Sequence, residues 1–265
     1  MHWLLLRGWG REQRHWHDFP SDLRRALQPE SIVLLDLAGA GTERERLPRP
    51  SVPWLARDVA RRFQRLPSVR AVEPKPAAER QWGVIGLSLG GMVALELCWL
   101  LPHRFARAVI INASSRLSAP SSRLARSALA GLGKVLMAAD ALERETRLLE
   151  LTSELPFAEL RRHARRSVDS GCTERVRGSA LLGQLCAAVR FVPPPPGSVS
   201  TALCFLGSQR DRLVNHRCSR DLALRYGAPY REHPWAGHDL PLDDPDWVCQ
   251  QIAGCHLDVT RHLAV

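Results

Sequence analysis

Ser88 stands between glycines in the segment Gly86–Gly91, a pattern that suits chemistry at a serine hydroxyl. The apolar pair Val84-Ile85 precedes the segment, and a helix-like stretch beginning at Met92 follows it. A strand, a tight turn through serine and a helix make up the G-x-S-x-G nucleophile elbow, whose glycines permit a turn that exposes the hydroxyl. The backbone N–H of Leu89 would then stabilise an oxyanion. The alternative is a glycine-rich turn whose serine only caps the helix.

Two later loops carry residues that could complete such a site. A serine nucleophile needs a base, and the base needs an acid that orients it. Asp211 follows the apolar run Thr201–Leu206, and His238 lies in a loop before the last helix-like stretch. In open α/β sheets, ligands bind beyond the carboxyl ends of the strands, which is where Asp211 is expected. Ser88, Asp211 and His238 are therefore predicted to act as nucleophile, acid and base.

The acid and the base each have a structural interpretation as well. Asp211 could be a turn residue, and His238 could be a surface or capping histidine. Asp36 is the alternative acid, because it also ends a predicted strand. Asp239 and Asp243 suit that role less well, since they sit beside the histidine that they would have to orient.

The loop after the first strand, Arg7-Gly8-Trp9-Gly10, is expected to supply a second oxyanion donor. The backbone N–H of Trp9 is the best candidate, beside that of Leu89. The Trp9 indole could equally be a core aromatic that fills the loop, and both descriptions can hold together. Arg7 and Leu87 are predicted to line the substrate pocket.

Apolar runs alternate with helix-like stretches along most of the chain. Six strands are predicted, at His2–Arg7, Ser31–Leu37, Gln81–Leu87, Phe105–Ile111, Thr201–Leu206 and Pro229–Glu232. Helices are predicted near Asp18–Leu27 and Ser51–Leu66, after Ser88 and from Pro245 to Leu263, with a loop at Ser68–Glu79. Continuous apolar strands separated by helices are typical of an α/β fold with a mostly parallel sheet that is covered on both faces.

Residues 114–198 break this alternation. The stretch has a helical period, is rich in Leu, Ala and Arg, and ends in the stiff connector Pro193–Gly197. We predict that residues 1–113 and 199–265 form the core, and that residues 114–198 are a helical insertion packed over the strand ends as a lid. Its densest basic run, Arg161–Arg166, is either a solvated helix face or a docking patch for an acidic carrier protein or an anionic acyl group.

The formal net charge is +10, and Lys75 and Lys134 are the only lysines. Arginine-rich codon usage explains this, and attraction to an acidic partner or substrate is the alternative. The arginines are spread through helical stretches without interleaved aromatics, so no nucleic-acid partner is expected. No apolar run approaches the ~20 residues of a membrane span. The apolar start Met1–Arg7 suits a strand better than a signal peptide, so a cytoplasmic location is expected.

The seven cysteines are an odd number and include no C-x-x-C pair. Several, such as Cys98 and Cys204, lie in apolar runs. We interpret them as reduced thiols, mostly buried. No metal-ligand spacing is visible, so no metal site is predicted.

The motifs together resemble the α/β-hydrolase superfamily over nearly the whole chain. The order Ser88, Asp211, His238 is the order of that superfamily. Gly8-Trp9-Gly10, the loop from Asp36 to Gly41 and the elbow are similar to those of lid-bearing carboxylesterases related to the pimeloyl-acyl-carrier-protein methyl ester esterase. Members usually carry His where Arg7 stands, Pro in place of Ala38, and a first hairpin that is expected to be absent here.

This resemblance implies a serine hydrolase that cleaves carboxylic esters or thioesters through an acyl-enzyme and without a cofactor. The implied partner is a small-molecule acyl ester or thioester. An acyltransferase with the same triad is one alternative, and a non-catalytic binding protein of this fold is another. Ser88 excludes the haloalkane dehalogenases of this fold, because those enzymes use an aspartate nucleophile.

Overall fold

The computed structural model describes residues 1–70, 81–172 and 176–262 of the chain. Its strands are β1 (His2–Leu6), β2 (Ser31–Leu34), β3 (Trp82–Leu87), β4 (Phe105–Ile111), β5 (Ala202–Ser208) and β6 (Tyr230–His233). They form one sheet in the order β2-β1-β3-β4-β5-β6, and every neighbouring pair is parallel. The predicted α/β fold with about six strands is confirmed, and the sheet is parallel throughout.

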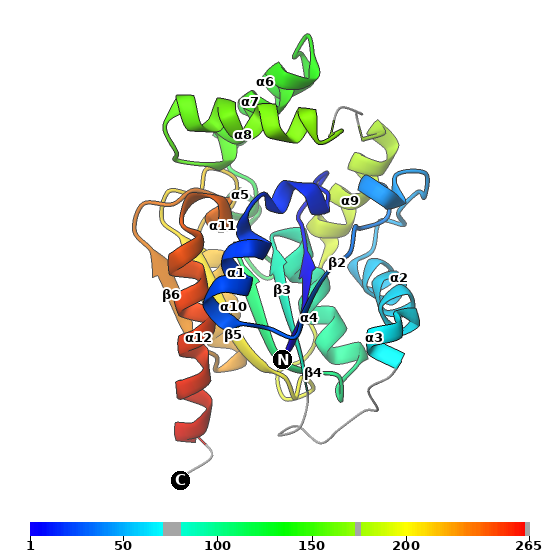
Figure 1. The fold of residues 1–265 in the computed structure, drawn as a ribbon, viewed down its shortest axis with the longest axis vertical. Coiled ribbons are helices and arrows are strands. Elements are labelled where there is room, and N and C mark those ends of the chain that lie inside the picture. Colours follow the sequence, from blue (N-terminus) through cyan, green and yellow to red (C-terminus); the bar gives the residue numbers. More distant parts are fainter. Residues whose placement is uncertain (71–80, 173–175, 263–265) are drawn as a thin grey trace.

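Twelve α-helices occur in the described ranges (Figure 1). They are α1 (Phe19–Leu27), α2 (Val52–Arg65), α3 (Pro67–Arg70), α4 (Leu89–Leu100), α5 (Pro120–Arg123), α6 (Arg126–Leu136), α7 (Ala141–Thr152), α8 (Phe157–Asp169), α9 (Gly178–Arg190), α10 (Arg217–Tyr226), α11 (Leu240–Asp243) and α12 (Pro245–His262). Short 3₁₀ helices lie at Gln13–Trp16 and Gly41–Glu43. The first three residues of the predicted loop Ser68–Glu79 belong to α3 instead, and the rest of that loop, with the predicted helix end at Leu263, lies outside the described residues.

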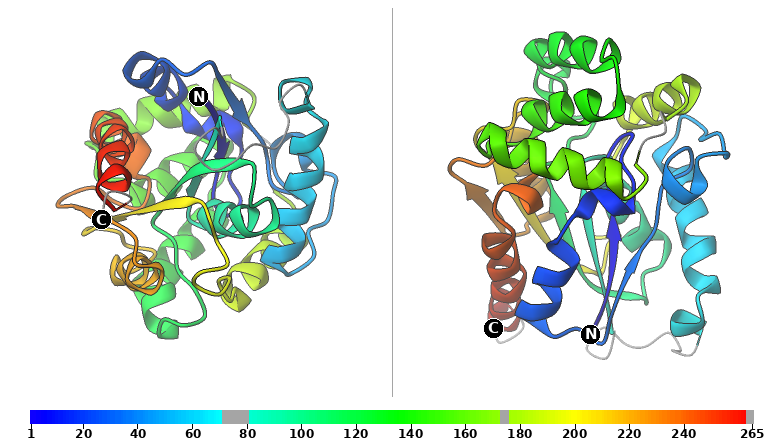
Figure 2. Two further views of the ribbon diagram at one scale, coloured as in Figure 1. Left: turned by 90° about the horizontal axis from the view of Figure 1, so that it is seen from below. Right: turned by 45° about the horizontal axis from the view of Figure 1, so that its top comes forward.

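The strand side chains alternate between two apolar layers, as the pleat of a strand requires. On β1, Leu4 and Leu6 pack in one core with residues of α2, α4 and α10. Trp3 and Leu5 pack in the other core with residues of α1 and α12. Figure 2 shows helices on both sides of the sheet when it is viewed from below. Burial on both faces explains why the central strands read as unbroken apolar runs.

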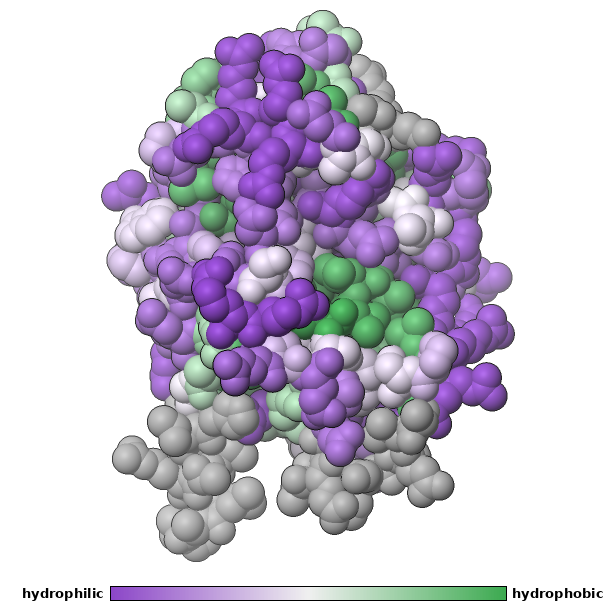
Figure 3. Space-filling view, viewed as in Figure 1, coloured by the Kyte–Doolittle hydropathy of each residue, from purple (hydrophilic) through white to green (hydrophobic). Residues whose placement is uncertain are grey.

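The edge strand β2 is shorter than predicted, because the chain leaves the sheet before Asp36. Its four residues are only partly buried. Figure 3 shows an apolar patch over this edge, on a face that is otherwise mostly polar. Asp36 accepts hydrogen bonds from the N–H of Gln13 at 2.6 Å and the N–H of Thr42 at 2.9 Å. The bend therefore ties the loops that follow β1 and β2 to each other.

Between β4 and β5 the chain adds the helices α5 to α9. Figures 1 and 2 show α6, α7 and α8 stacked beyond the carboxyl ends of the strands, while α9 contacts α2 and α4. This segment falls within the predicted insertion, residues 114–198, and its separation as a lid stays a prediction. No helix of the described residues is long and apolar enough to cross a membrane.

Candidate active site

Ser88 lies at the junction of β3 and α4 with a backbone φ of +59°. A non-glycine residue rarely adopts this conformation, which costs about 1–3 kcal/mol. The flanking glycines allow the turn, because a side chain at either position would be too close to the backbone. A Cβ on Gly86 would lie 2.3 Å from the carbonyl oxygen of Gly90, and a Cβ on Gly90 would lie 2.2 Å from that of Leu6. The Ser88 N–H donates to the carbonyl oxygen of Ile111 at 2.8 Å. Helix α4 therefore begins against the end of β1, with the serine at the tip of the turn.

Asp211 and His238, which lie 27 residues apart, meet in the structure. Nδ1 of His238 donates to Oδ2 of Asp211 at 2.7 Å, and the Asp211 side chain has no exposed surface. Oδ1 of Asp211 accepts from the N–H groups of Leu213 and Val214 at 2.8 and 2.9 Å. The carboxylate is thus fixed in the loop after β5. Since the bond to Asp211 uses the proton on Nδ1, Nε2 of His238 is left as an acceptor.

Ser88 and His238 line one cavity of about 170 Å³. The loop after β1 and the start of α4 form one wall, helices of the insertion form the opposite side, and the loops after β5 and β6 complete it. Most of the lining is aliphatic, with Leu87, Leu89 and Met92 on the core side and Leu148 and Leu185 on the insertion side. The cavity suits an apolar chain whose reacting end lies at the elbow.

The predicted oxyanion loop lies directly against the serine. A Cβ on Gly8 would lie 3.1 Å from the Cβ of Ser88. The N–H groups of Gly10 and Arg11 donate to Oε1 of Gln184 and to the carbonyl oxygen of Gly8, respectively. The Trp9 indole lines the cavity and donates through Nε1 to the carbonyl oxygen of Leu181 at 2.8 Å. Both descriptions of Trp9, as a backbone donor and as an aromatic plug, fit this placement.

Arg7 lines the cavity and forms a buried ion pair with Asp239, and its contact with a substrate stays a prediction. NH1 and NH2 of Arg7 donate to the two carboxylate oxygens of Asp239 at 2.9 and 2.6 Å. Both side chains are only 4% exposed. The guanidinium carbon lies 4.9 Å from the centre of the Trp16 ring. Burial acts to raise the pKa of Asp239, and the adjacent Arg7 guanidinium outweighs it, so the pKa of this carboxyl is lowered.

Asn112, which was not predicted from the sequence, holds in place the histidine loop, the loop between β6 and α11 that carries His238. It follows β4 directly, and its φ is +46°. Its Nδ2 donates to Oγ of Ser208 and to the carbonyl oxygen of His238, both at 2.9 Å, and lies 3.4 Å from the carbonyl oxygen of Gly237. Its Oδ1 accepts from the Ser208 N–H at 3.0 Å. One buried amide therefore joins the ends of β4 and β5 to the residue that would act as base.

We expect Asn112→Ala to lower kcat/KM for a hydrolysed ester by about 10- to 100-fold, the effect typical of supporting contacts around a site. Alanine removes every side-chain bond and also strains the positive φ. Asn112→Gly is the matched variant, because glycine accepts the φ and lacks the amide. Steady-state kinetics should show the same loss in both variants, and both should be less stable than wild type, with the alanine variant the less stable of the two because of its strained φ. An active glycine variant would contradict the positioning role.

Asp243 anchors the other side of the histidine loop. It accepts from the N–H of Gly237 at 2.6 Å, from the N–H of Glu154, and from the hydroxyl of Ser153. Burial, with the like charge of Asp239 as a lesser cause, raises the pKa of Asp243 from 3.8 to about 6. The folded protein therefore holds this proton more tightly than the unfolded chain does.

Because the pKa of Asp243 is raised, its ionisation destabilises the fold as pH increases from about 4 to about 6. We expect the free energy of unfolding of the wild type to fall by about 3 kcal/mol across this window, relative to Asp243→Asn, which cannot ionise. Urea unfolding of both proteins at several pH values between 4 and 7 measures the difference. A difference that stays constant with pH would contradict the assignment.

The alternative acid Asp36 is engaged elsewhere, since Gln13 and Thr42 donate to it. Neither Asp239 nor Asp243 takes the acid's place, because Arg7 and the insertion bind them.

All seven cysteines are free thiols, and four of them are buried. The ligand atoms of Glu12, His15 and Cys172 lie within 4.8 Å of one another. Hydrogen bonds already join these side chains: Nδ1 of His15 accepts from the Glu12 N–H, and the Glu12 carboxylate accepts from Arg14 and Cys172.

The basic run Arg161–Arg166 lies on α8, where Arg161, Arg162, Arg165 and Arg166 are exposed. Arg166 binds Asp18 with two hydrogen bonds of 2.6 Å, and Arg162 lies 3.7 Å from Glu159. The run is therefore partly neutralised by acids beside it, and the docking of an acidic carrier protein to it stays a prediction.

The sequence model of a protein family, described as the alpha/beta hydrolase family, matches residues 3–251 of this chain. The chain belongs to the alpha/beta hydrolase family. The match spans the sheet and every residue of the candidate site. Membership identifies the protein as a hydrolase-type enzyme, and the narrower similarity to the pimeloyl-ester carboxylesterases stays a prediction. A search of curated proteins found no match.

Three solved structures are similar to this chain over nearly its whole length. A lipase-esterase related protein from Clostridium acetobutylicum has a TM-score of 0.69 at 15% identity, with 96% of this chain and 93% of that chain covered. A thermophilic esterase from Thermogutta terrifontis has a TM-score of 0.68 at 17% identity, with coverages of 98% and 90%. A thioesterase of prodiginine biosynthesis from Streptomyces coelicolor has a TM-score of 0.60 at 15% identity, with coverages of 96% and 85%. At these identities the likeness concerns the fold.

Within this alpha/beta hydrolase, Asn112 and the ion pair of the predicted pocket residue Arg7 could have been suspected from the sequence. Asn112 directly follows the apolar run Phe105–Ile111, so it falls at the carboxyl edge of the sheet where ligands bind. Arg7 ends the first strand at the same edge, and a charge there needs a partner once it is buried. Asp239 is that partner, 232 residues away in the chain.

Proposed function

We propose that the protein hydrolyses carboxylic esters or thioesters through Ser88, His238 and Asp211. The observation that carries the proposal is the 2.7 Å bond from Nδ1 of His238 to Asp211, made by a histidine that shares a cavity with the elbow serine. The bond selects the imidazole tautomer whose Nε2 can accept a proton. The positive φ of Ser88 adds support, because strain of this kind persists where function needs it.

The proposed reaction begins when Oγ of Ser88 attacks the acyl carbon and its proton passes to Nε2 of His238. The carbonyl oxygen becomes an oxyanion, which the N–H groups of Trp9 and Leu89 bind. His238 then gives the proton to the leaving alcohol or thiol, and the acyl group stays on Ser88. Water attacks this acyl-enzyme, His238 takes a proton from the water, and the acid leaves as the proton returns to Ser88.

Each proposed donor has a structural basis. Leu89 is the first residue of α4, and the first N–H groups of a helix have no partner within it. The positive end of the helix dipole points the same way. Trp9 lies in the loop that contacts Ser88 through Gly8. Asp211 stabilises the imidazolium that forms when His238 accepts the proton.

The aliphatic lining of the cavity favours an apolar acyl chain. The insertion supplies part of that lining, including Leu124, Leu132, Leu148 and Leu185. We propose that the insertion acts as a lid that shapes the acyl pocket and limits access of water. Acyl length is then set by the insertion rather than by the triad.

A panel of esters and thioesters of graded acyl length tests this proposal. We expect wild-type protein to release the free acid and to react with a fluorophosphonate probe. Product analysis in the presence of an alcohol or thiol acceptor separates hydrolysis from acyl transfer, since a transferase would give the new ester or thioester. A protein that turns over no substrate and takes up no probe would instead be a binding protein of this fold.

A further inference from the structure

Arg123 is a charged residue of the cavity that no carboxylate of the described chain neutralises. It ends α5 and lines the cavity wall that the insertion provides. Its NH2 donates to the carbonyl oxygens of Ala188 and Val189 at 2.9 and 2.5 Å, near the end of α9. Its Nε is buried and has no hydrogen-bond partner among the described residues. The guanidinium therefore caps α9 through one nitrogen and leaves another unsatisfied.

Nε of Arg7 is also buried without a hydrogen-bond partner among the described residues, but both other arginines of the cavity differ from Arg123 in being paired with a carboxylate. Arg7 pairs with Asp239, and Arg11 donates to both carboxylate oxygens of Glu145 at 2.6 and 2.7 Å. Within the described ranges, no carboxylate forms an ion pair with Arg123. Burial lowers the pKa of Arg123, and the like charge of Arg116 acts in the same direction. Arg123 is half-buried, and no acid of the described chain offsets the cost of withdrawing its charge from water.

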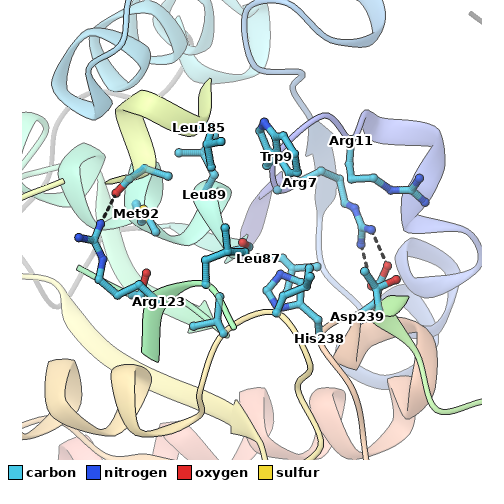
Figure 4. Close-up of a pocket in the computed structure, with 18 of the residues that line it drawn as sticks. Arg7, Trp9, Arg11, Leu87, Leu89, Met92, Arg123, Leu185, His238 and Asp239 are labelled. Carbon is cyan, nitrogen blue, oxygen red and sulfur yellow. Dashed lines mark hydrogen bonds and ion pairs between the residues drawn. The ribbon is translucent and has the colours of Figure 1, made fainter. Parts of the chain in front are cut away.

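Arg123 also lies away from the proposed reacting groups. Figure 4 shows Arg7, Asp239 and His238 on one side of the cavity and Arg123 on the other, with Leu87 and Leu89 between them. The lining near Arg123 is aliphatic and includes Pro120, Leu124 and Val189. A molecule that extends from His238 to Arg123 would contact aliphatic side chains between them and a guanidinium without a paired acid at the far end.

We propose that Arg123 binds a carboxylate of the substrate, remote from the ester or thioester that reacts at Ser88. This inference rests on the proposed hydrolase function and narrows its substrate to an acyl compound with an anionic end. A carboxylate would supply the acceptor that Nε lacks, and charge-assisted bonds to a guanidinium are strong in a desolvated site. The carboxylate could belong to the acyl part, as in a monoester of a dicarboxylic acid, or to the leaving part, as in an ester of a hydroxy acid.

Matched substrate pairs test the proposal. One series contains monomethyl esters of straight-chain dicarboxylic acids, and its neutral partners carry a terminal methyl group in place of the free carboxylate. A second series places the carboxylate on the leaving alcohol instead. We expect wild-type protein to prefer the carboxylate-bearing member of one series by about 10- to 100-fold in kcat/KM, mostly through KM. The series that shows the preference identifies which part of the substrate holds the anion.

Arg123→Gln should remove this preference, mostly through a higher KM for the carboxylate-bearing ester. Glutamine keeps an N–H that can donate to the carbonyl oxygens of Ala188 and Val189, so the end of α9 stays capped, but it carries no charge. Arg123→Lys should retain part of the preference, because the charge remains and the planar fork is lost. Arg165→Gln is the matched control, since Arg165 is exposed on α8 and does not line the cavity, and it should leave the preference unchanged.

Binding to the Ser88→Ala variant gives a readout that needs no turnover. Calorimetry with the preferred monoester should show binding that weakens about 10- to 100-fold when Arg123→Gln is added. If wild-type protein hydrolyses neutral and carboxylate-bearing esters equally well, the inference fails while the proposed function stands. If no ester or thioester is hydrolysed at all, the proposed function itself fails. A preference that survives in Arg123→Gln would also overturn the assignment.

Discussion

Replacing Ser88 with alanine is expected to lower kcat for every ester and thioester substrate by about 10⁴-fold or more. The hydroxyl is the proposed nucleophile, so its loss removes the acyl-enzyme route and leaves only the oxyanion donors and substrate binding. Purified wild type and variant should be compared on the best substrate of the acyl-length panel. Labelling by a fluorophosphonate probe should disappear with the activity.

The variant is expected to fold as well as the wild type. Alanine and serine suffer similar strain at a φ of +59°, and Ser88 makes its hydrogen bond to Ile111 through the backbone. Loss of activity would therefore reflect the missing nucleophile rather than misfolding. A urea unfolding curve can check that the variant is as stable as the wild type. Ser114 is another serine that lines the cavity. Persistent labelling of Ser88→Ala would mean that a residue such as Ser114 is the nucleophile and that the proposal is wrong.

The sequence predicted the six strands and their parallel arrangement because the pattern that carries them is local. Phe105–Ile111 is an unbroken apolar run, and β4 has these same bounds. The shortening of β2 could not be read in this way. Leu35 and Leu37 continue the apolar pattern, and the bend depends on bonds from Gln13 and Thr42 to Asp36. Such bonds depend on loops that meet only after folding.

The candidate triad could be proposed from sequence because each member lies where a strand ends, and the edge of a parallel sheet brings such positions together. The contacts that hold the triad in place were not predicted. Asn112 donates to the carbonyl oxygen of His238, which lies 126 residues further along the chain, and no sequence motif marks an asparagine with this role. The lack of an acidic partner for Arg123 could likewise not be predicted, because whether a charge is paired depends on which side chains face it in three dimensions.

Breaking the pair between Arg7 and Asp239 is expected to lower the free energy of unfolding by about 3–5 kcal/mol, because each single change leaves a buried charge without its partner. Arg7→Met and Asp239→Leu are the single variants, and urea unfolding at pH 7 measures both. Since Arg7 lowers the pKa of Asp239, the stabilisation is present above the ordinary pKa of an aspartate and is lost as pH falls through the lowered value. The cost of Arg7→Met should therefore shrink below about pH 4.

The double variant separates stability from positioning. Met and Leu together replace the ion pair by apolar groups, which often restores the stability that either single change removes. Activity should not return with it. Asp239 adjoins His238 and its N–H donates to the carbonyl oxygen of Thr152 at 2.7 Å, so the ion pair fixes the loop that carries the base. We expect kcat of the double variant to stay about tenfold below wild type, with KM nearly unchanged. Full recovery of kcat along with stability would show that the pair only holds the fold together and does not orient the histidine.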